Sequence, residues 1–404
     1  MKIPFAPPFI DDDVKNEVLS ALESGWITTG PKVKALEQET AKYAGVEQVL
    51  CVNSATSGLM LILHFLGIGK GDEVIIPAYT YCATALAVMH VGATPVMVDV
   101  KDDFNIDPKK VKAAITDRTK AIVPVDFAGW PCDYDALFAV VDNENIRAKF
   151  RPGGEVQQKL KRIAIVSDAA HSFGAEYKGK RTGSLADITV FSFHAVKNLT
   201  TAEGGAICIT LPSPFDNEAT YKTLRLWTLN GQTKDAFSKS QVGGWRYDIV
   251  YPGFKINMPD VCAAIGLAQI RKYEQSVWQE RKRVFEYFTN EFTRDDWAEL
   301  PPFINDESRC SYHLYPIRIK GITEAQRDII IEKISLQDVA VNVHFIPLPM
   351  LTIFKEMNYK IENYPVTYNN YSREISLPIY PQLSNKLCGC IVNVVRNAVI
   401  ETLG

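Results

Sequence analysis

The 404-residue sequence lacks a strong charge of either sign, because 44 lysines and arginines stand against 47 aspartates and glutamates. The resulting net charge of −3 is spread along the chain without a block of like charges. Proteins that bind nucleic acid or an anionic membrane surface by electrostatics usually carry a basic patch. The composition therefore indicates neither a nucleic-acid partner nor a membrane partner.

Long hydrophobic runs and clustered cysteines are also scarce. The most apolar helix-like run, GLMLILHFLGIG (58–69), is too short to span a bilayer, and the first residues, MKIPFAPPFIDDD, lack the apolar core of a signal peptide. Of eight cysteines, only Cys388 and Cys390 lie close together, which is neither a zinc-site spacing nor a disulfide framework. These features predict a cytoplasmic protein without a metal site.

Short apolar runs rich in β-branched residues recur through the first 258 residues. Segments long enough for helices separate most of them, a pattern typical of an α/β fold whose mostly parallel sheet is buried on both faces. We expect seven strands, at residues 49–53, 73–77, 95–99, 121–125, 163–168, 188–193 and 205–209. The connection 130–162 is expected to be helical, with a surface insertion at 143–160 around the sequence RPGG.

The pattern changes after residue 258. Residues 259–288 show one long amphipathic helical pattern, which predicts a helix that links two domains. The remainder mixes expected strands (YHLYPIRI, VAVNVHFI) with expected helices (EAQRDIIIEKI, NKLCGCIVNVVRNAVIETL). We therefore predict a large α/β domain, 1–258, whose segment 1–25 packs near a smaller C-terminal α+β domain within 259–404.

Three chemically distinct groups follow expected strands. Asp168 ends IAIVSD, Lys197 follows ITVFSF, and NSATSG opens a helix after VLCVN, with Asn53 or Ser54 as its N-cap. Ligands of open α/β sheets bind outside the carboxyl ends of the strands. An acid, an amine and a helix N-terminus at that edge suit pyridoxal phosphate, which has a ring nitrogen, an aldehyde and a phosphate.

In this interpretation Lys197 forms the Schiff base, Asp168 keeps the ring nitrogen protonated, and the backbone N–H groups of Ala55 and Thr56 bind the phosphate. Taken singly, a strand-terminal aspartate is more often a cap or turn residue, and a lysine after a strand is more often a surface residue. The order and spacing of the groups together carry the prediction.

Several longer motifs resemble one family. DAAHSFGA (168–175) and FSFHAVKNLTTAEGG (191–205), together with NSATSGL, GKGDEVIIPAYTYCAT, KINMPD and VHFIPL, resemble the DegT/DnrJ/EryC1/StrS family of sugar aminotransferases. The resemblance covers nearly the whole chain. It implies the aspartate-aminotransferase fold (fold type I), pyridoxal phosphate as cofactor, and the roles already given to Lys197 and Asp168.

The resemblance also implies further cofactor contacts. Tyr81 matches an aromatic residue that stacks on the cofactor ring, and Thr56 and Ser192 match phosphate ligands. His171 matches a residue at the phenolic oxygen, although a core histidine is an alternative. Asn257 matches an asparagine that reaches the phosphate of the neighbouring subunit, which implies a homodimer with composite sites.

The chain departs from the family pattern at Ala202, where TTAEGG replaces the usual TTGEGG. This substitution leaves open whether the unusual backbone angle that glycine permits is needed there. The insertion at 143–160 is longer than the common pattern.

The resemblance implies an aminotransferase that uses L-glutamate and a keto-sugar linked to UDP or dTDP, commonly a 4-keto-6-deoxy sugar, for polysaccharide or glycan synthesis. Alternatives are a sugar dehydratase of the same family and a non-catalytic regulator on the same fold. Dehydratases of one branch replace the Schiff-base lysine with histidine, and those of another need an iron–sulfur cluster, for which no cysteine cluster is present. Lys197 therefore favours transamination.

Overall fold

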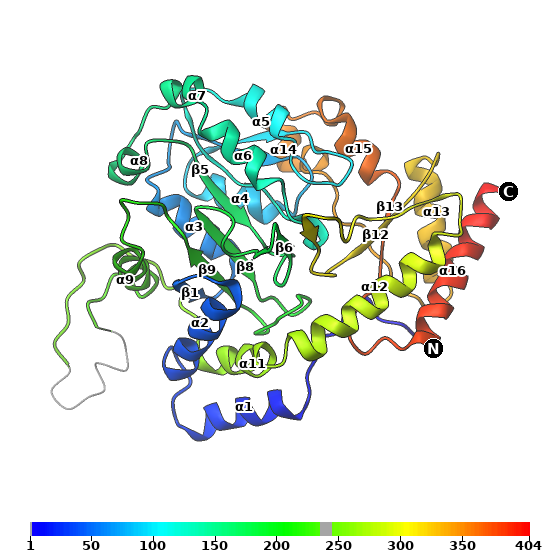
Figure 1. Ribbon diagram of the computed structural model, residues 1–404, viewed down its shortest axis with the longest axis horizontal. Helices are drawn as coiled ribbons and strands as arrows, with labels where there is room; N and C mark the ends of the chain where they lie inside the picture. The colour runs from blue at the N-terminus through cyan, green and yellow to red at the C-terminus, as the bar shows by residue number, and fades with distance from the viewer. Residues whose placement is uncertain (1, 235–244) are drawn as a thin grey trace.

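The computed structural model describes residues 2–234 and 245–404, and a seven-stranded sheet forms its centre (Figure 1). The strand order is β1-β9-β8-β5-β4-β2-β3, in which β9 runs antiparallel to both of its neighbours and the other pairs are parallel. Each apolar run of the sequence forms one strand: β1 (Gln48–Val52), β2 (Glu73–Pro77), β3 (Thr94–Val98), β4 (Thr119–Ile122), β5 (Ala164–Asp168), β8 (Ile188–Ser192) and β9 (Gly205–Ile209). The predicted mostly parallel sheet is confirmed.

Helices cover both faces of this sheet because successive strand residues point to opposite sides. On β2, Val74 and Ile76 pack with the helices α3 (Ala55–Phe65) and α4 (Cys82–His90). Ile75 packs on the other face, in a cluster that includes residues of α5 (Pro108–Ala114) and α6 (Tyr134–Val141). Burial on both faces explains why these strands are almost continuously apolar in sequence.

The connection between β4 and β5 is helical, as expected. It contains α6, α7 (Glu144–Lys149) and α8 (Glu155–Leu160). Residues 151–153, the start of RPGG, are exposed between α7 and α8.

The expected single helix at 259–288 is interrupted. It consists of α11 (Asp260–Ile270), a π-helical turn at Glu274–Trp278 and α12 (Gln279–Phe292). α11 packs on α1 (Asp12–Glu23) and α2 (Pro31–Ala44), whereas α12 packs on α16 (Asn385–Leu403). The prediction of one unbroken helix is wrong because the amphipathic pattern does not register the extra residue that a π turn accommodates.

The C-terminal part contains a second, antiparallel sheet in the order β10-β12-β13. Its strands are β10 (Ala298–Glu299), β12 (Tyr315–Ile319) and β13 (Glu374–Leu377), and α13 (Glu324–Ser335) and α16 pack together beside it (Figure 1). Shorter elements are β6 (Glu176–Tyr177), β7 (Lys180–Arg181), β11 (Ser308–Arg309), α9 (Asn217–Thr228), α14 (Thr352–Glu356) and α15 (Pro365–Tyr371).

The segment VAVNVHFI, expected to be a strand, forms only two isolated bridges. Val339 pairs with Ile3, and Asn342 pairs with Ser376 of β13. The strand expectation is wrong because His344 and Phe345 turn into a cavity instead of continuing along the sheet edge.

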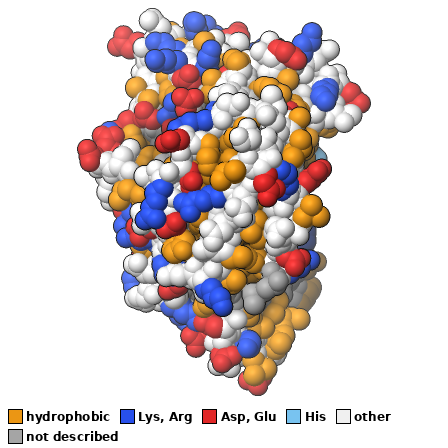
Figure 2. Space-filling model, turned by 90° about the vertical axis from the view of Figure 1, so that its right-hand side faces the viewer, with side chains coloured by type: hydrophobic (Ala, Val, Ile, Leu, Met, Phe, Trp, Pro, Cys, Tyr) orange, Lys and Arg blue, Asp and Glu red, His pale blue; other side chains and the backbone are white. Residues whose placement is uncertain are grey.

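Charged side chains of both signs are interspersed with apolar ones on the face shown in Figure 2. Among the helices of the described residues, none is long and apolar enough to cross a membrane.

Candidate active site

A cavity of about 430 Å³ lies at the carboxyl ends of β5 and β8. It brings together seven of the eight residues predicted for the site: Ala55, Thr56, Tyr81, Asp168, His171, Ser192 and Lys197. Parallel pairing explains part of this arrangement, since Asp168 lies opposite Val190 in the register of β5 and β8, two residues before Ser192. Asn257 does not line the cavity.

Lys197 lies in the turn that follows β8, where its backbone N–H donates to the carbonyl of His194 over 2.9 Å. Burial lowers the pKa of Lys197 to about 8, with a smaller contribution from the charge of Arg281, while Asp168 acts in the opposite direction. A neutral amine is the nucleophilic form. The cavity therefore favours the form of Lys197 that can attack a carbonyl carbon.

Asp168 is buried at the end of β5. Its Oδ2 accepts a hydrogen bond from Thr84 Oγ1 (2.8 Å), and its Oδ1 accepts one from the backbone N–H of Ala170 (3.2 Å). Burial raises the pKa of Asp168 despite these two bonds and the nearby charge of Lys197. A cationic ring nitrogen beside this carboxyl would stabilise its ionised form.

The N-terminus of α3 forms another wall of the cavity. Of the two N-cap candidates, Ser54 is the cap, because its Oγ accepts from the backbone N–H of Ser57 over 3.1 Å. Ala55 and Thr56 follow in the first turn, where backbone N–H groups have no partner within the helix. Such a terminus suits a phosphate.

His171 is buried, and its tautomer follows from one contact. Its Nδ1 accepts from the backbone N–H of Ala128 over 3.2 Å, so a neutral ring carries its proton on Nε2. Burial, assisted by the charge of Lys197, lowers the pKa of His171 well below its usual value. The residue is thus a neutral donor, which suits a phenolic oxygen.

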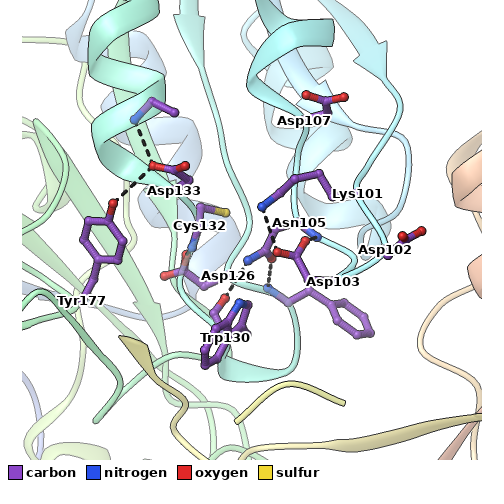
Figure 3. A network of polar contacts seen from close by, with 12 residues as sticks. Lys101, Asp102, Asp103, Asn105, Asp107, Asp126, Trp130, Cys132, Asp133 and Tyr177 are labelled. Atoms are coloured by element: carbon purple, nitrogen blue, oxygen red, sulfur yellow. Dashed lines mark hydrogen bonds and ion pairs between the residues drawn. The ribbon is translucent and has the colours of Figure 1, made fainter. Parts of the chain in front are cut away.

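A buried polar network stabilises the turn between Asp126 and Cys132, which contains Ala128. Figure 3 shows Asn105, Asp126, Trp130 and Cys132 of this network. Asn105 donates to the carbonyl of Trp130 (2.9 Å) and accepts from the backbone N–H of Phe127 (3.0 Å). Asp126 accepts from the backbone N–H of Cys132 (2.9 Å) and from the hydroxyl of Ser172 (2.7 Å), the residue after His171. The network fixes His171 from both sides.

Together these groups fit pyridoxal phosphate. The cavity offers an amine for its aldehyde, a buried acid for its ring nitrogen, a neutral donor for its phenolic oxygen and a helix N-terminus for its phosphate. Tyr81 lies at the mouth, 59% exposed, with its ring centroid 5.6 Å from that of Phe345. Its exposed ring is available for a stacking contact.

The cavity residues that the sequence did not indicate include Thr84, His313 and His344. Thr84 supports Asp168, and His313 Nδ1 lies 2.9 Å from Asn198 Oδ1. The two histidines are more than a hundred residues from Lys197 and reach the cavity only because the C-terminal part folds back onto the sheet. The motif VHFIPL, which contains His344, was the one available signal.

Two other expectations have structural outcomes. Ala202 has a φ of +66°, so the unusual backbone angle is present although alanine replaces glycine. Asn257 donates to Thr29 Oγ1 (2.6 Å) and accepts from Lys255 Nζ (2.6 Å), outside the cavity of its own chain. Its service to a partner's phosphate stays a prediction.

Comparison with known proteins gives one consistent result. The model of the DegT/DnrJ/EryC1/StrS aminotransferase family matches residues 8–148 and 155–396, and the six residues between these ranges fall at the end of α7 and the exposed loop before α8. The spore coat polysaccharide biosynthesis protein SpsC of Bacillus subtilis is 35% identical over 404 residues, covering 98% of this chain and 97% of that protein.

Two solved structures extend the comparison. Spr1654 from Streptococcus pneumoniae, which carries the provisional name of sugar aminotransferase, is 41% identical in its PLP form, with complete coverage of both chains and a TM-score of 0.95. PseC from Helicobacter pylori, an aminotransferase involved in the biosynthesis of pseudoaminic acid, is 26% identical, with 99% and 100% coverage and a TM-score of 0.85.

Proposed function

The chain belongs to the DegT/DnrJ/EryC1/StrS aminotransferase family, and from this premise we propose that it transfers an amino group from L-glutamate to a nucleotide-linked keto-sugar. It is a transaminase that uses pyridoxal phosphate. The observation that carries the proposal is the buried Lys197 amine, whose pKa is lowered to about 8, in one cavity with the buried Asp168 and a helix N-terminus.

When bound, pyridoxal phosphate supplies an electron sink for the carbon that gains or loses the amine. We assign the covalent attachment of the cofactor to Lys197 and the protonation of its ring nitrogen to Asp168. Once released, Lys197 Nζ can accept a proton from the reacting carbon and return one to it, because its pKa of about 8 lies near working pH.

The remaining contacts orient the cofactor. We assign its phosphate to the backbone of Ala55 and Thr56 with the hydroxyl of Ser192, its phenolic oxygen to His171 and its ring face to Tyr81. These roles agree with the placement of all five residues around one cavity.

The sugar acceptor is supported by the names of the relatives. SpsC is named for polysaccharide biosynthesis, Spr1654 provisionally for sugar amination and PseC for pseudoaminic acid biosynthesis. We infer that the acceptor is a UDP- or dTDP-linked keto-sugar, such as a 4-keto-6-deoxy sugar, and that the product serves polysaccharide or glycan synthesis.

We also propose a homodimer in which Asn257 contacts the phosphate bound by the partner. Trp245, Tyr247, Ile249 and Val250, in the segment that leads toward Asn257, are each more than half exposed. A cluster of exposed apolar side chains is typical of an interaction surface. A second copy of the chain would cover it.

Steady-state kinetics with a panel of acceptors tests the proposed substrate class. With glutamate as donor, kcat/KM is expected to be at least about a hundredfold higher for a UDP- or dTDP-keto-sugar than for pyruvate or oxaloacetate, because these small keto acids lack the nucleotide and its binding contacts. The nucleotide alone, added as an inhibitor, is the matched control for binding. Comparable kcat/KM for a keto acid would overturn the sugar assignment.

A further inference from the structure

A chain of three polar side chains runs from the cavity into the core of the C-terminal sheet. His344 lines the cavity, and its Nδ1 lies 2.9 Å from Ser376 Oγ. Ser376 Oγ is hydrogen-bonded to Glu374 Oε1, and both Ser376 and Glu374 are fully buried on β13. The roles proposed above use neither of these buried residues.

The surroundings fix the geometry of this chain. Asn342, two residues before His344, exchanges backbone hydrogen bonds in both directions with Ser376. The ring of Phe5 stacks on the imidazole of His344 at a centroid distance of 5.5 Å. The backbone N–H of His344 donates to Glu374 Oε2 over 3.0 Å. Because Oε2 is occupied as an acceptor, a proton on this carboxyl belongs on Oε1, the oxygen that faces Ser376.

Two proton arrangements satisfy the chain. With Glu374 ionised, Ser376 donates to Oε1 and accepts from Nδ1–H of His344, which leaves Nε2 as a bare acceptor. With Glu374 protonated, Oε1–H donates to Ser376, whose hydroxyl donates to Nδ1, and the imidazole proton resides on Nε2. Since Ser376 has one hydrogen, each state of the carboxyl specifies one tautomer.

We propose that Glu374 is a positioning residue that, acting through Ser376, decides whether His344 presents a hydrogen-bond donor or an acceptor to the substrate in the cavity. The proposal rests on the proposed function only in treating the cavity as the substrate site. Its ligand class is an oxygen group: a carbonyl or carboxylate for the donor form, and a hydroxyl for the acceptor form.

Burial places the protonation change of Glu374 within an accessible pH range. Burial raises the pKa of Glu374 to about 8, and burial with the charge of Lys197 lowers the pKa of His344 to about 3. The imidazole therefore stays neutral while the carboxyl titrates.

Other charged and titratable groups lie near the three side chains His344, Ser376 and Glu374. Arg318 of β12 is ion-paired with Glu299, and Arg327 of α13 with Asp328 (2.6 Å). The remaining groups are Tyr79 beside Glu374, and Lys197, His171 and His313 around the cavity. Lys197 also titrates near pH 8, so the test must separate its effect from that of Glu374.

Two of the other three cavity histidines, His171 and His313, provide internal references. The backbone N–H of Ala128 fixes His171 with its proton on Nε2. Asn198 Nδ2 donates to the carbonyl of Ser311 (2.7 Å), so Asn198 Oδ1 is an acceptor and His313 carries its proton on Nδ1. Neither tautomer depends on a carboxyl group.

Nitrogen-15 NMR of histidine-labelled protein tests the proposal without turnover. The chain has six histidines, and His344→Gln assigns the resonances of His344. Between pH 6.5 and 9.5, in cofactor-free and cofactor-bound protein, Nε2 of His344 is expected to change from the protonated to the unprotonated type near pH 8, while His171 and His313 stay constant. Lys197→Met is expected to retain this change.

Two variants test whether Glu374 acts on His344 through Ser376, the relay formed by these three side chains. In Glu374→Gln the amide mimics the protonated acid, so His344 is expected to keep Nε2–H at every pH, and Ser376→Ala is expected to abolish the pH step even if Glu374→Gln does not fold. The exposed Glu362→Gln is the matched control and should behave as wild type. A constant tautomer in wild type, a step that survives in either relay variant, or a step lost in Lys197→Met would overturn the proposal.

Discussion

Lys197 and Asp168 are each shifted away from the charge that they carry in water. Burial is the largest cause for both residues: it lowers the pKa of the amine to about 8 and raises the pKa of the carboxyl. Their mutual attraction only partly offsets this effect. The cavity therefore raises the fraction of Lys197 that is a neutral nucleophile, and a ligand that brings a positive charge to Asp168 would stabilise the ionised carboxyl.

The lowered pKa of Lys197 predicts how cofactor-free protein captures pyridoxal phosphate. Only the neutral amine reacts, so the rate of covalent attachment is expected to rise with pH and level off above about 8, with about a tenth of the plateau rate at pH 7. Borohydride trapping followed by mass spectrometry measures this rate. The exposed Lys70→Ala is a control that should not alter it, and a midpoint near 10, the value of an ordinary lysine, would contradict the account.

Ala202 predicts a small change in stability. With φ at +66°, the residue bears the steric cost of a left-handed conformation, about 1–2 kcal/mol for a residue with a Cβ. Glycine removes this cost but loses more conformational entropy on folding, by about 0.4–1 kcal/mol. Ala202→Gly is therefore expected to raise the free energy of unfolding by about 0.5 kcal/mol.

Urea denaturation measures this difference. Ala148→Gly, a matched change at an exposed position of α7, is expected to lower the free energy of unfolding by about 1 kcal/mol. If both variants were destabilised equally, Ala202 would not be strained.

Some site residues could be predicted from local sequence and others could not. Asp168 ends β5 and Lys197 lies in the turn after β8, so strand prediction alone places both residues at one edge of the sheet. Thr84 lies inside a helix, and His313 lies beyond the linking helices, so each requires knowledge of which distant segments meet. Sequence showed that Ala202 departs from the family pattern but not that its backbone keeps the left-handed conformation.

At the scale of elements, the proposed phosphate site at the N-terminus of α3 depends on how closely this helix approaches β8 and β9. Gly205 begins β9, and a Cβ there would lie 2.7 Å from the backbone nitrogen of Ala55 and 2.8 Å from the carbonyl oxygen of Phe191. Both contacts are with backbone, which cannot rotate away. The absence of a side chain at Gly205 therefore permits the approach.

Gly205→Ala is expected to push the N-terminus of α3 away from the strands. The variant should lose about 2 kcal/mol of stability, within the range for overpacking, and should bind pyridoxal phosphate at least tenfold more weakly. Calorimetry and equilibrium titration measure the two effects. Gly69→Ala, whose Cβ would meet only an ordinary 3.6 Å contact, is the control. Unchanged cofactor affinity in Gly205→Ala would refute the claim that this close approach shapes the phosphate site.

The elements themselves were predictable to different degrees. All seven strands of the central sheet were predicted, because strands buried on both faces form nearly continuous apolar runs in the sequence. The π turn at 274–278 and the departure of residues 342–345 from a strand could not be found, because both positions keep an apolar pattern compatible with regular structure. The second error concealed His344.

At the scale of the whole molecule, Asn257 is the residue that distinguishes a self-contained site from a composite one. It lies outside the cavity of its own chain, bonded to Thr29 and Lys255. A two-fold dimer would place two copies of this residue symmetrically. The proposed composite site therefore makes a prediction about mixed dimers.

Lys197→Ala and Asn257→Asp chains are each expected to be nearly inactive as homodimers. The first lacks its nucleophile, and the second places a carboxylate against the phosphate. In a heterodimer both lesions fall in one site, and the other site has an intact Lys197 and an intact Asn257. Subunit exchange should therefore restore activity, up to one working site per heterodimer.

Native mass spectrometry measures the heterodimer fraction alongside the recovered rate. The matched control mixes Lys197→Ala with Lys197→Met, which cannot complement because neither chain carries the amine. No recovery in the presence of heterodimers would mean that Asn257 does not serve the partner's site.

The central claim is that Lys197 enables the transfer of an amino group from glutamate to a nucleotide-linked keto-sugar. Mass spectrometry of the sugar product after incubation with ¹⁵N-labelled glutamate tests it most directly. The account predicts one ¹⁵N per product molecule and a loss of at least about a thousandfold in rate for Lys197→Ala. A sugar product that lacks nitrogen, or unchanged label transfer in Lys197→Ala, would contradict it.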